Sequence, residues 1–192
     1  MRKITPFLLL VFLLSAFGAS SQSDEILLAS VKIDGKWGYI DKTGKIVVKP
    51  QFEGSYPHPF QERLAAIKLD GMCGYIDKTG KIAIKPQFDG AEDFKGGLAR
   101  IKLGGKWGYA DKSGKIVIKP QFDYTRGFKE GLARVWLDNE WGYGYIDKSG
   151  KIAIKPQFGD AEDFEGGLAR IKLDVKWGYS KSLRAVCRRC AK

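Results

Sequence analysis

Short runs in which apolar and polar residues alternate recur along the chain, and most of them end at residues typical of tight turns. Residues 64–85, LAAIKLDGMCGYIDKTGKIAIK, contain three such runs. Asp70-Gly71 separates the first two and predicts a type I′ turn, because both central residues of that turn need positive φ. Asp77-Lys78-Thr79-Gly80 separates the next two and fits a type I turn followed by a left-handed glycine. The pattern predicts a three-stranded antiparallel β-meander.

The two turns impose registers that agree with each other. They place Ile67 opposite Gly74 and Ile76 opposite Ile82, and a slip of one residue would exchange the two faces of the sheet. The absence of a side chain at Gly74 then makes room for close packing. One predicted face is mainly aliphatic (Ala65, Ile67, Leu69, Met72, Gly74, Ile76, Ile82, Ile84), and the other is mixed (Ala66, Lys68, Cys73, Tyr75, Lys81, Ala83, Lys85).

A proline and two phenylalanines follow each third strand. Because proline cannot donate to a strand ladder, we expect Pro50, Pro86, Pro120 and Pro156 to end these strands. We expect the segment that follows to be a loop or short turn whose aromatic side chains cover an edge or pack between repeats; a short helix at residues 90–94 is the alternative. The pairs are Phe52 and Phe60, Phe88 and Phe94, Phe122 and Phe128, and Phe158 and Phe164.

This pattern occurs four times. The Gln of the Pro-Gln-Phe phrase stands at positions 51, 87, 121 and 157, and a fifth copy begins at residues 176–179, Lys-Trp-Gly-Tyr. Residues 26–179 therefore form one array of tandem repeats. We expect an all-β fold of three-stranded meanders in an open or partly curled array, with propeller-like or barrel-like closure as the alternative.

The phrase GKWGYIDK[TS]GKI[VA]IKPQF, followed by FxxGLA, resembles the bacterial WG repeat, also called the KWG repeat, over nearly all of residues 31–179. Departures from the pattern are Cys73 in place of Trp, Ala110 in place of Ile, and a two-residue insertion at 142–144. The resemblance implies a tandem β-rich array, often exported or joined to other domains, with binding or scaffolding roles and no common catalytic residues.

The two ends of the chain differ from the array. Residues 1–21 have the basic start, short apolar run and small residues of a secretory signal peptide, and a retained membrane anchor is the alternative. We expect export to the cell envelope, periplasm or medium, with no membrane span once the signal is removed. Residues 180–192 form a basic tail that departs from the repeat, either as an altered end or as a cap or partner-binding segment.

Net charge and cysteines narrow the choice of ligands. The formal charge is +11, but the leader contributes 2 and the tail 5, which leaves about +4 on repeats where Lys is mixed with Asp and Glu. This distribution argues against nucleic acid. Cys73 occupies a Trp position without an activating neighbour. Cys187 and Cys190 have half of a zinc-site spacing, and we favour a local disulfide or two free thiols over a metal site.

Candidate catalytic groups are few. His58 lies between two prolines and fits a loop better than a general base. The pairs Glu92-Asp93 and Glu162-Asp163 lack calcium-loop spacing, and adjacent residues in an extended segment point apart. We expect no enzyme activity, no cofactor and no metal. A pocket that joins His58 to a carboxylate or hydroxyl would favour an enzyme instead.

The remaining functional candidates are binding surfaces. We expect a non-catalytic module that binds or organises a protein partner through sheet edges or its aromatic face; the alternative is a cell-envelope glycan that stacks on exposed Trp and Tyr. Whether these aromatic side chains are exposed or buried decides between binding surface and framework. The candidate binding residues are Trp37, Tyr39, Tyr75, Trp107, Tyr109, Trp141, Tyr145 and Trp177.

Overall fold

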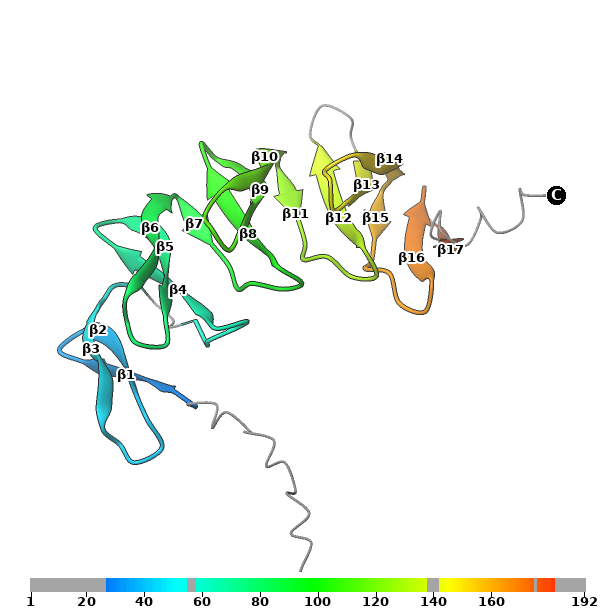
Figure 1. Cartoon of the computed structure of the whole chain (residues 1–192). Helices are drawn as coiled ribbons and strands as arrows, with labels where there is room; N and C mark the ends of the chain where they lie inside the picture. Colours follow the sequence, from blue (N-terminus) through cyan, green and yellow to red (C-terminus); the bar gives the residue numbers. More distant parts are fainter. Residues whose placement is uncertain (1–26, 55–57, 138–141, 175, 182–192) are drawn as a thin grey trace, which may run out of the picture.

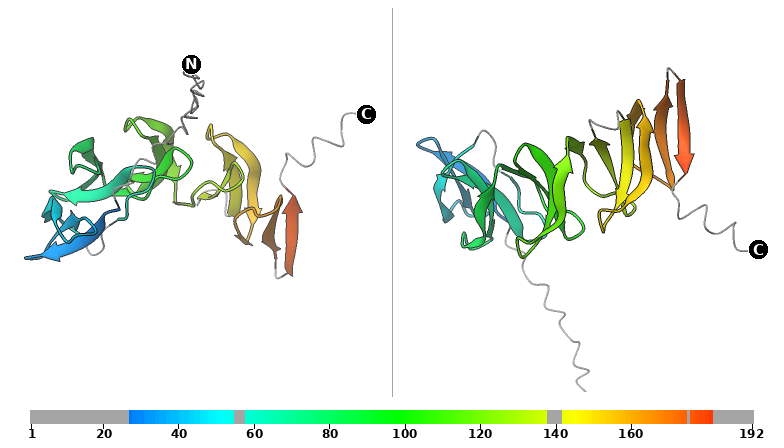
Figure 2. Two further views of the ribbon diagram at one scale, coloured as in Figure 1. Left: turned by 60° about the horizontal axis from the view of Figure 1, so that its bottom comes forward. Right: turned by 90° about the horizontal axis from the view of Figure 1, so that it is seen from above.

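A computed structural model describes residues 27–54, 58–137, 142–174 and 176–181 (Figure 1). The regular secondary structure within these residues consists of β-strands, which form five antiparallel sheets of three or four strands. The sheets follow one another as a curved, open row, with the first and last sheets at opposite ends (Figures 1 and 2). The predicted all-β array of tandem meanders is confirmed, in its open form. Predictions for residues 1–21 and 182–192, and for Trp141, lie outside the described residues.

We call each sheet a unit. Unit 1 contains β1 (Ala29–Ile33), β2 (Lys36–Ile40) and β3 (Ile46–Phe52). Unit 2 contains β4 (Leu64–Leu69), β5 (Met72–Asp77) and β6 (Ile82–Phe88). Unit 3 contains β7 (Gly90–Ala91), β8 (Leu98–Leu103), β9 (Lys106–Asp111) and β10 (Ile116–Phe122). Unit 4 contains β11 (Tyr124–Thr125), β12 (Leu132–Leu137), β13 (Gly142–Asp147) and β14 (Ile152–Phe158). Unit 5 contains β15 (Asp160–Ala161), β16 (Leu168–Leu173) and β17 (Lys176–Lys181).

The two predicted turns of unit 2 are confirmed. Asp70 and Gly71 have φ values of 50° and 79°, as a type I′ turn requires. Gly80 has a φ of 85°, and the Asp77 N–H donates to the Lys81 carbonyl at 2.9 Å, which closes the second hairpin. Since the Asp77 carboxylate also accepts bonds from the Thr79 N–H and hydroxyl, at 2.9 and 2.6 Å, the turn is fixed by its own side chains.

The third strand of each unit departs from the predicted register. In unit 2, Ile76 pairs with Ile82 as predicted, but Tyr75 pairs with Ile84 because an extra residue forms a bulge between these two pairs. The prediction that placed Ile84 on the aliphatic face is therefore wrong, and Ile84 lies on the tyrosine face. β6 also continues through Pro86, which lies in an irregular stretch without regular pairing. Each of the four third strands ends at the phenylalanine two residues after its proline. The predicted strand ends at Pro50, Pro86, Pro120 and Pro156 are therefore wrong.

The bulge explains the glycine of the Trp-Gly-Tyr phrase. Gly74 lies opposite Ile67, as predicted, but its closest neighbours are in the third strand. A Cβ atom at Gly74 would lie 2.5 Å from the Ile84 carbonyl oxygen and 2.7 Å from the Pro86 nitrogen. The bulged third strand therefore crosses directly over this position, and only glycine leaves it room.

Neighbouring units pack an aromatic face against an aliphatic one. Tyr75, Phe88 and Phe94 from unit 2 and its connector cluster with Ala99 and Ile101 of unit 3. The same arrangement joins units 1 and 2, units 3 and 4, and units 4 and 5. The predicted packing of the phenylalanines between repeats is confirmed. Each interior unit therefore buries both of its faces, which is how a stacked repeat obtains a continuous core.

We call the segment between the third strand of one unit and the first long strand of the next a connector. Each connector contains a tight turn just before that long strand. In the connector at residues 89–97, Gly90–Ala91 forms the short strand β7 rather than the alternative helix, and the Lys95 N–H donates to the Leu98 carbonyl at 2.8 Å. The four connector turns lie along the inner edge of the arc in Figure 1. No helix long and apolar enough to cross a membrane occurs within the described residues.

Candidate functional site

The tyrosines predicted as binding residues are almost completely buried. Their exposed fractions are 2%, 0%, 1% and 1% for Tyr39, Tyr75, Tyr109 and Tyr145. Each ring packs on the phenylalanine of the connector that follows it (Phe60, Phe94, Phe128 or Phe164), with ring centroids 4.8 or 4.9 Å apart. This corrects the expectation of an exposed tyrosine row, because the bulged third strand and the neighbouring unit cover that face.

The tyrosine hydroxyls instead hold the connectors. The hydroxyls of Tyr39, Tyr75, Tyr109 and Tyr145 donate to the backbone carbonyls of His58, Glu92, Arg126 and Glu162 at 2.8, 2.6, 2.6 and 2.6 Å. Burial raises the pKa of Tyr39 and of Tyr109 to about 12, and it also raises the pKa of Tyr75 and Tyr145. The phenols therefore stay protonated as donors at neutral pH.

The tryptophans of units 1 and 3 are half-buried and covered by cations. The Lys32 ammonium lies 5.2 Å from the centroid of Trp37, within cation–π distance. Trp107 has the Arg100 guanidinium at 4.5 Å and the Lys102 ammonium at 5.7 Å. These ring faces are occupied and do not form an open stacking platform.

The last tryptophan of the predicted row has a different environment. Trp177 is 46% exposed, with the Arg170 guanidinium 4.7 Å from its ring centroid. The candidate Trp141 lies outside the described residues. The predicted aromatic row is thus divided between buried tyrosines, covered tryptophans and an exposed end.

The four residues whose backbone carbonyls accept the tyrosine hydrogen bonds lie at equivalent positions, but their side chains are not the same in all copies. We call His58, Glu92, Arg126 and Glu162 the connector column; each stands two residues before the phenylalanine of its connector. Their backbones are fixed identically by a tyrosine, while their side chains change from imidazole to carboxylate to guanidinium. The framework therefore presents different chemistry at equivalent places.

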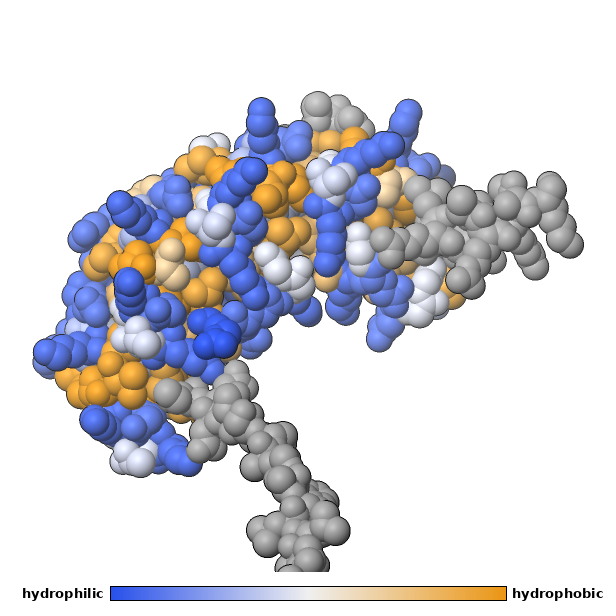
Figure 3. Space-filling model, in the orientation of Figure 1, coloured by the Kyte–Doolittle hydropathy of each residue, from blue (hydrophilic) through white to orange (hydrophobic). Residues whose placement is uncertain are grey.

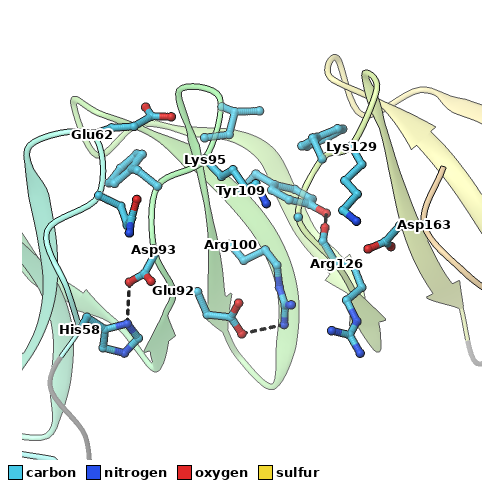
Figure 4. A pocket seen from close by; sticks show the side chains of 15 residues that line it. His58, Glu62, Glu92, Asp93, Lys95, Arg100, Tyr109, Arg126, Lys129 and Asp163 are labelled. Atoms are coloured by element: carbon cyan, nitrogen blue, oxygen red, sulfur yellow. Dashed lines mark hydrogen bonds and ion pairs between the residues drawn. The ribbon is translucent and has the colours of Figure 1, made fainter. Parts of the chain in front are cut away.

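A pocket of about 650 Å³ lies along this column (Figure 4). All four connectors contribute to its lining, together with β8 and β9 of unit 3. The lining residues are His58, Gln61, Glu62, Glu92, Asp93, Phe94, Lys95, Leu98, Arg100, Tyr109, Arg126, Gly127, Phe128, Lys129 and Asp163. Its volume is in the range of ordinary ligand sites.

Ion pairs organise the end of the pocket near unit 2. The Asp93 carboxylate points toward His58, with the His58 Nδ1 at 2.8 Å, and the Glu92 carboxylate points the other way, toward Arg100 at 2.9 Å (Figure 4). The prediction that these adjacent carboxylates point apart is confirmed. A His–carboxylate pair in a pocket is the feature that would favour an enzyme. Among the described residues the lining includes no Ser, Thr or Cys that could act as a nucleophile, and the Tyr109 hydroxyl is engaged with the connector backbone.

A glutamate clips neighbouring connectors together at the rim. The Glu62 carboxylate accepts bonds from the backbone N–H groups of Gly96 and Gly97, at 2.5 and 3.1 Å, and from the Lys112 ammonium at 2.8 Å. The hydrogen bond from Lys112, followed by those from the two glycines, lowers the pKa of Glu62. Glu130 makes the equivalent bonds to the N–H groups of Gly166 and Gly167, at 2.7 and 2.9 Å.

The clip is missing between the second and third connectors. Gly96 stands at the position of Glu62 and Glu130, so it offers no carboxylate to the next turn. Lys148 instead lies near this turn, with its ammonium 3.5 Å from the Gly96 carbonyl oxygen. The middle of the pocket therefore lies between two clipped pairs of connectors.

Several polar groups of the pocket lack partners within the described residues. Arg126 is exposed and makes no ion pair there, and Asp163 Oδ1 is buried without a hydrogen-bond partner, as is Arg100 Nε. The lining contains both acidic side chains (Glu62, Glu92, Asp93, Asp163) and basic ones (Lys95, Arg100, Arg126, Lys129). A ligand that supplies groups of both signs would satisfy this arrangement.

Cysteine and metal chemistry has little support in the described part of the chain. Cys73 is half-buried beside Asp89, and burial raises the pKa of its thiol, which favours the unreactive protonated form. No group of three or more His, Cys, Asp or Glu side chains suited to a metal ion occurs within those residues. Cys187 and Cys190 lie outside them.

Sequence reasoning did not identify this pocket, since only Tyr109 of the candidate binding residues lines it. Aligning the copies on the phenylalanine of each connector would have identified the connector column. The His58–Asp93 contact joins residues 35 positions apart, and the Glu62 clip spans 34 positions to Gly96. Neither follows from a local pattern.

Comparison with known proteins agrees with these repeats. The model of the WG-containing repeat family matches residues 37–73, 74–107, 107–141 and 143–177. No curated protein matches the chain. Since the four matches together cover more than half of the sequence, the chain belongs to the WG-containing repeat family.

Proposed function

We propose that this array is an exported, non-catalytic scaffold that binds a protein partner through the pocket on its connectors. The supporting observation is that constant and variable positions of the repeat lie in different surroundings. The tyrosines that recur in units 1 to 4 are buried, whereas the connector column changes chemistry, and three of its members, His58, Glu92 and Arg126, line the pocket. Repeat proteins commonly bind along an extended surface that varies over a constant framework. Export rests on the leader-like residues 1–21.

The charges of the pocket suggest the chemistry of the partner. Glu62, Glu92, Asp93 and Asp163 supply negative charge, and Lys95, Arg100, Arg126 and Lys129 supply positive charge. Nucleic acid would meet the carboxylates of Glu62, Asp93 and Asp163, and a neutral glycan would leave Arg126 without an ionic partner. An extended polypeptide segment with both polar and charged side chains fits better, because an acidic side chain pairs with the exposed Arg126 guanidinium and a donor group satisfies the buried Asp163 Oδ1.

Glycan binding through the aromatic row has no comparable support. It requires open ring faces, whereas the four tyrosines are buried and the rings of Trp37 and Trp107 are covered by cationic side chains.

A peptide-display selection tests the proposed function. Random twelve-residue peptides are selected on the purified protein, and their affinities are measured by fluorescence anisotropy. We expect peptides with mixed charge, and at least tenfold weaker binding to Arg126→Glu, because the exposed guanidinium would meet an acidic peptide group. Lys119→Glu, an exposed position on β10 that is not part of the pocket lining, is the matched control and should bind as the parent does. Selected peptides that ignore both changes would contradict the proposal.

A further inference from the structure

The last unit repeats the first two strands of the meander without a third strand in the described residues. β16 and β17 pair in the same register as β8 and β9, with Ile171 opposite Gly178 as Ile101 is opposite Gly108. In units 1 to 4 the other edge of the second strand pairs with a third strand, β3, β6, β10 or β14. Within the described residues β17 pairs with β16 alone. The sequence after β17, SLRAVCRRCAK, lacks the phrase Ile-x-Ile-Lys-Pro-Gln-Phe, with Val48 in place of the second Ile in unit 1, that forms the third strands of units 1 to 4.

Gly178 marks the missing contact. A Cβ at Gly38, Gly74, Gly108 or Gly144 would lie 2.5 or 2.6 Å from a carbonyl oxygen of the third strand. A Cβ at Gly178 would have no atom within 4 Å. The glycine that makes room for a crossing strand is therefore present in unit 5, but none of the described residues occupies the space above it.

The aromatic residues of β17 are open in the same way. Tyr179 is 70% exposed, whereas its counterparts in the other four units are at most 2% exposed. The difference arises because third-strand and connector side chains, such as Ile84 and Phe94 around Tyr75, cover the tyrosine in those units. Within the described residues, β17 therefore has the edge and the aromatic side chains that bind a third strand and connector in units 1 to 4, without those partners.

We infer that the edge of β17 that no described residue pairs with accepts a third strand from another polypeptide that carries the Ile-x-Ile-Lys-Pro-Gln-Phe phrase of this repeat. The interfaces inside the chain define the expected geometry. By analogy with Tyr145 and Ile154, and with Tyr143 and Phe158, the first pairing joins Tyr179 to the second isoleucine and the second joins Trp177 to the phenylalanine. Strand addition supplies backbone hydrogen bonds, and the two side-chain contacts supply specificity. This surface is distinct from the pocket on the connectors, so the inference does not depend on the proposed function.

The test uses a peptide copied from the chain itself. Residues 151–164, KIAIKPQFGDAEDF, contain the third strand of unit 4 and the connector phenylalanine that packs on Tyr145. The labelled peptide is titrated into the purified full chain, and hydrogen exchange locates the site. We expect saturable binding and slowed exchange of the β17 amides, which should exchange quickly without peptide.

Two variants make the result specific. Gly178→Val should weaken peptide binding at least tenfold, because its side chain would meet the backbone of the incoming strand. It should leave the melting temperature within about 2 °C, since no atom of the described residues would lie within 4 Å of the added Cβ. A peptide with Ile154→Asp should also bind at least tenfold more weakly, because the charge would face Tyr179. Lys176→Ala, at the exposed start of β17, is the matched protein control.

Three results would overturn the inference. They are slow exchange of β17 before peptide is added, equal binding by Gly178→Val and the parent, and protection confined to unit 4, which would show exchange with the chain's own β14. Each of these leaves the pocket proposal intact, because that proposal is read out at Arg126.

Discussion

Units 3 and 5 carry the same four residues, Lys-Trp-Gly-Tyr, in two different surroundings. In unit 3 the third strand crosses over Gly108, and Tyr109 is 1% exposed. In unit 5 the space over Gly178 is open, and Tyr179 is 70% exposed. The first two strands pair in the same register in both units. The pairing of the first two strands therefore does not require the third strand. The glycine and the tyrosine of the second strand are needed for packing against the third strand and the next unit.

The largest expected difference concerns the two glycines. Gly108→Val should destabilise the protein by about 3 kcal/mol or more, because its Cβ would lie 2.5 Å from the Ile118 carbonyl oxygen and 2.7 Å from the Pro120 nitrogen. Gly178→Val should change stability by less than about 0.5 kcal/mol. Urea denaturation followed by circular dichroism measures both. Equal losses would show that the glycine is needed by the hairpin itself.

The tyrosine hydroxyls provide the next contrast. Tyr75→Phe should cost about 1–2 kcal/mol, because it removes a 2.6 Å hydrogen bond and leaves the part-buried Glu92 carbonyl without that donor. Tyr179→Phe should cost less than about 0.5 kcal/mol, since the side chain is mostly exposed. The same denaturation measurement compares them. A neutral Tyr75→Phe would mean that the connectors are held by other contacts.

These contrasts also show what the sequence could predict. The turns at Asp70-Gly71 and Asp77–Gly80 followed from residues that tolerate positive φ, so strands, hairpin register and the open array were within reach. The bulge before Ile84 was not, because an extra residue in one strand changes which face follows it without altering the local pattern. The burial of Tyr75 depended on that bulge and on the packing of unit 3, which is a tertiary property.

The pocket was predictable only as a location. Each copy has a connector of variable sequence, and loops positioned by a rigid scaffold commonly carry function. The contact between His58 and Asp93, however, depends on the distance between stacked units and on the tyrosine that fixes each connector backbone. No periodicity within a single copy encodes that distance.

The arginines next to the tryptophans give a smaller contrast. Arg100 is 12% exposed in its side chain, pairs with Glu92 at 2.9 Å and lies over Trp107, whereas Arg170 is 47% exposed in its equivalent pair at 3.2 Å. Arg100→Ala should cost about 1 kcal/mol and Arg170→Ala less than about 0.5 kcal/mol, because exposed ion pairs contribute little. Thermal melts of the two variants at equal salt measure the difference. A larger loss at Arg170 would contradict the view that unit 5 is incompletely packed.

The smallest effect concerns pH and the Glu62 clip. The folded-state pKa of Glu62 is lowered below its usual 4.5, mainly by the hydrogen bond from Lys112, so its contribution to stability is present above that value and is lost as pH falls through the folded pKa. Glu62→Gln should lower the melting temperature at neutral pH by a few degrees at most and flatten its decline below about pH 4.5.

Glu165 is the matched control at the end of the array. It lies one position before Gly166 in the exposed turn that leads into unit 5, and no salt bridge is found for it within the described residues. Glu165→Gln should therefore decline with falling pH as the parent does. If both variants flattened the curve equally, the acid sensitivity would reflect net charge rather than the clip. If only Glu62→Gln did so, the carboxylate that joins two interior connectors would account for stability that the end of the array lacks.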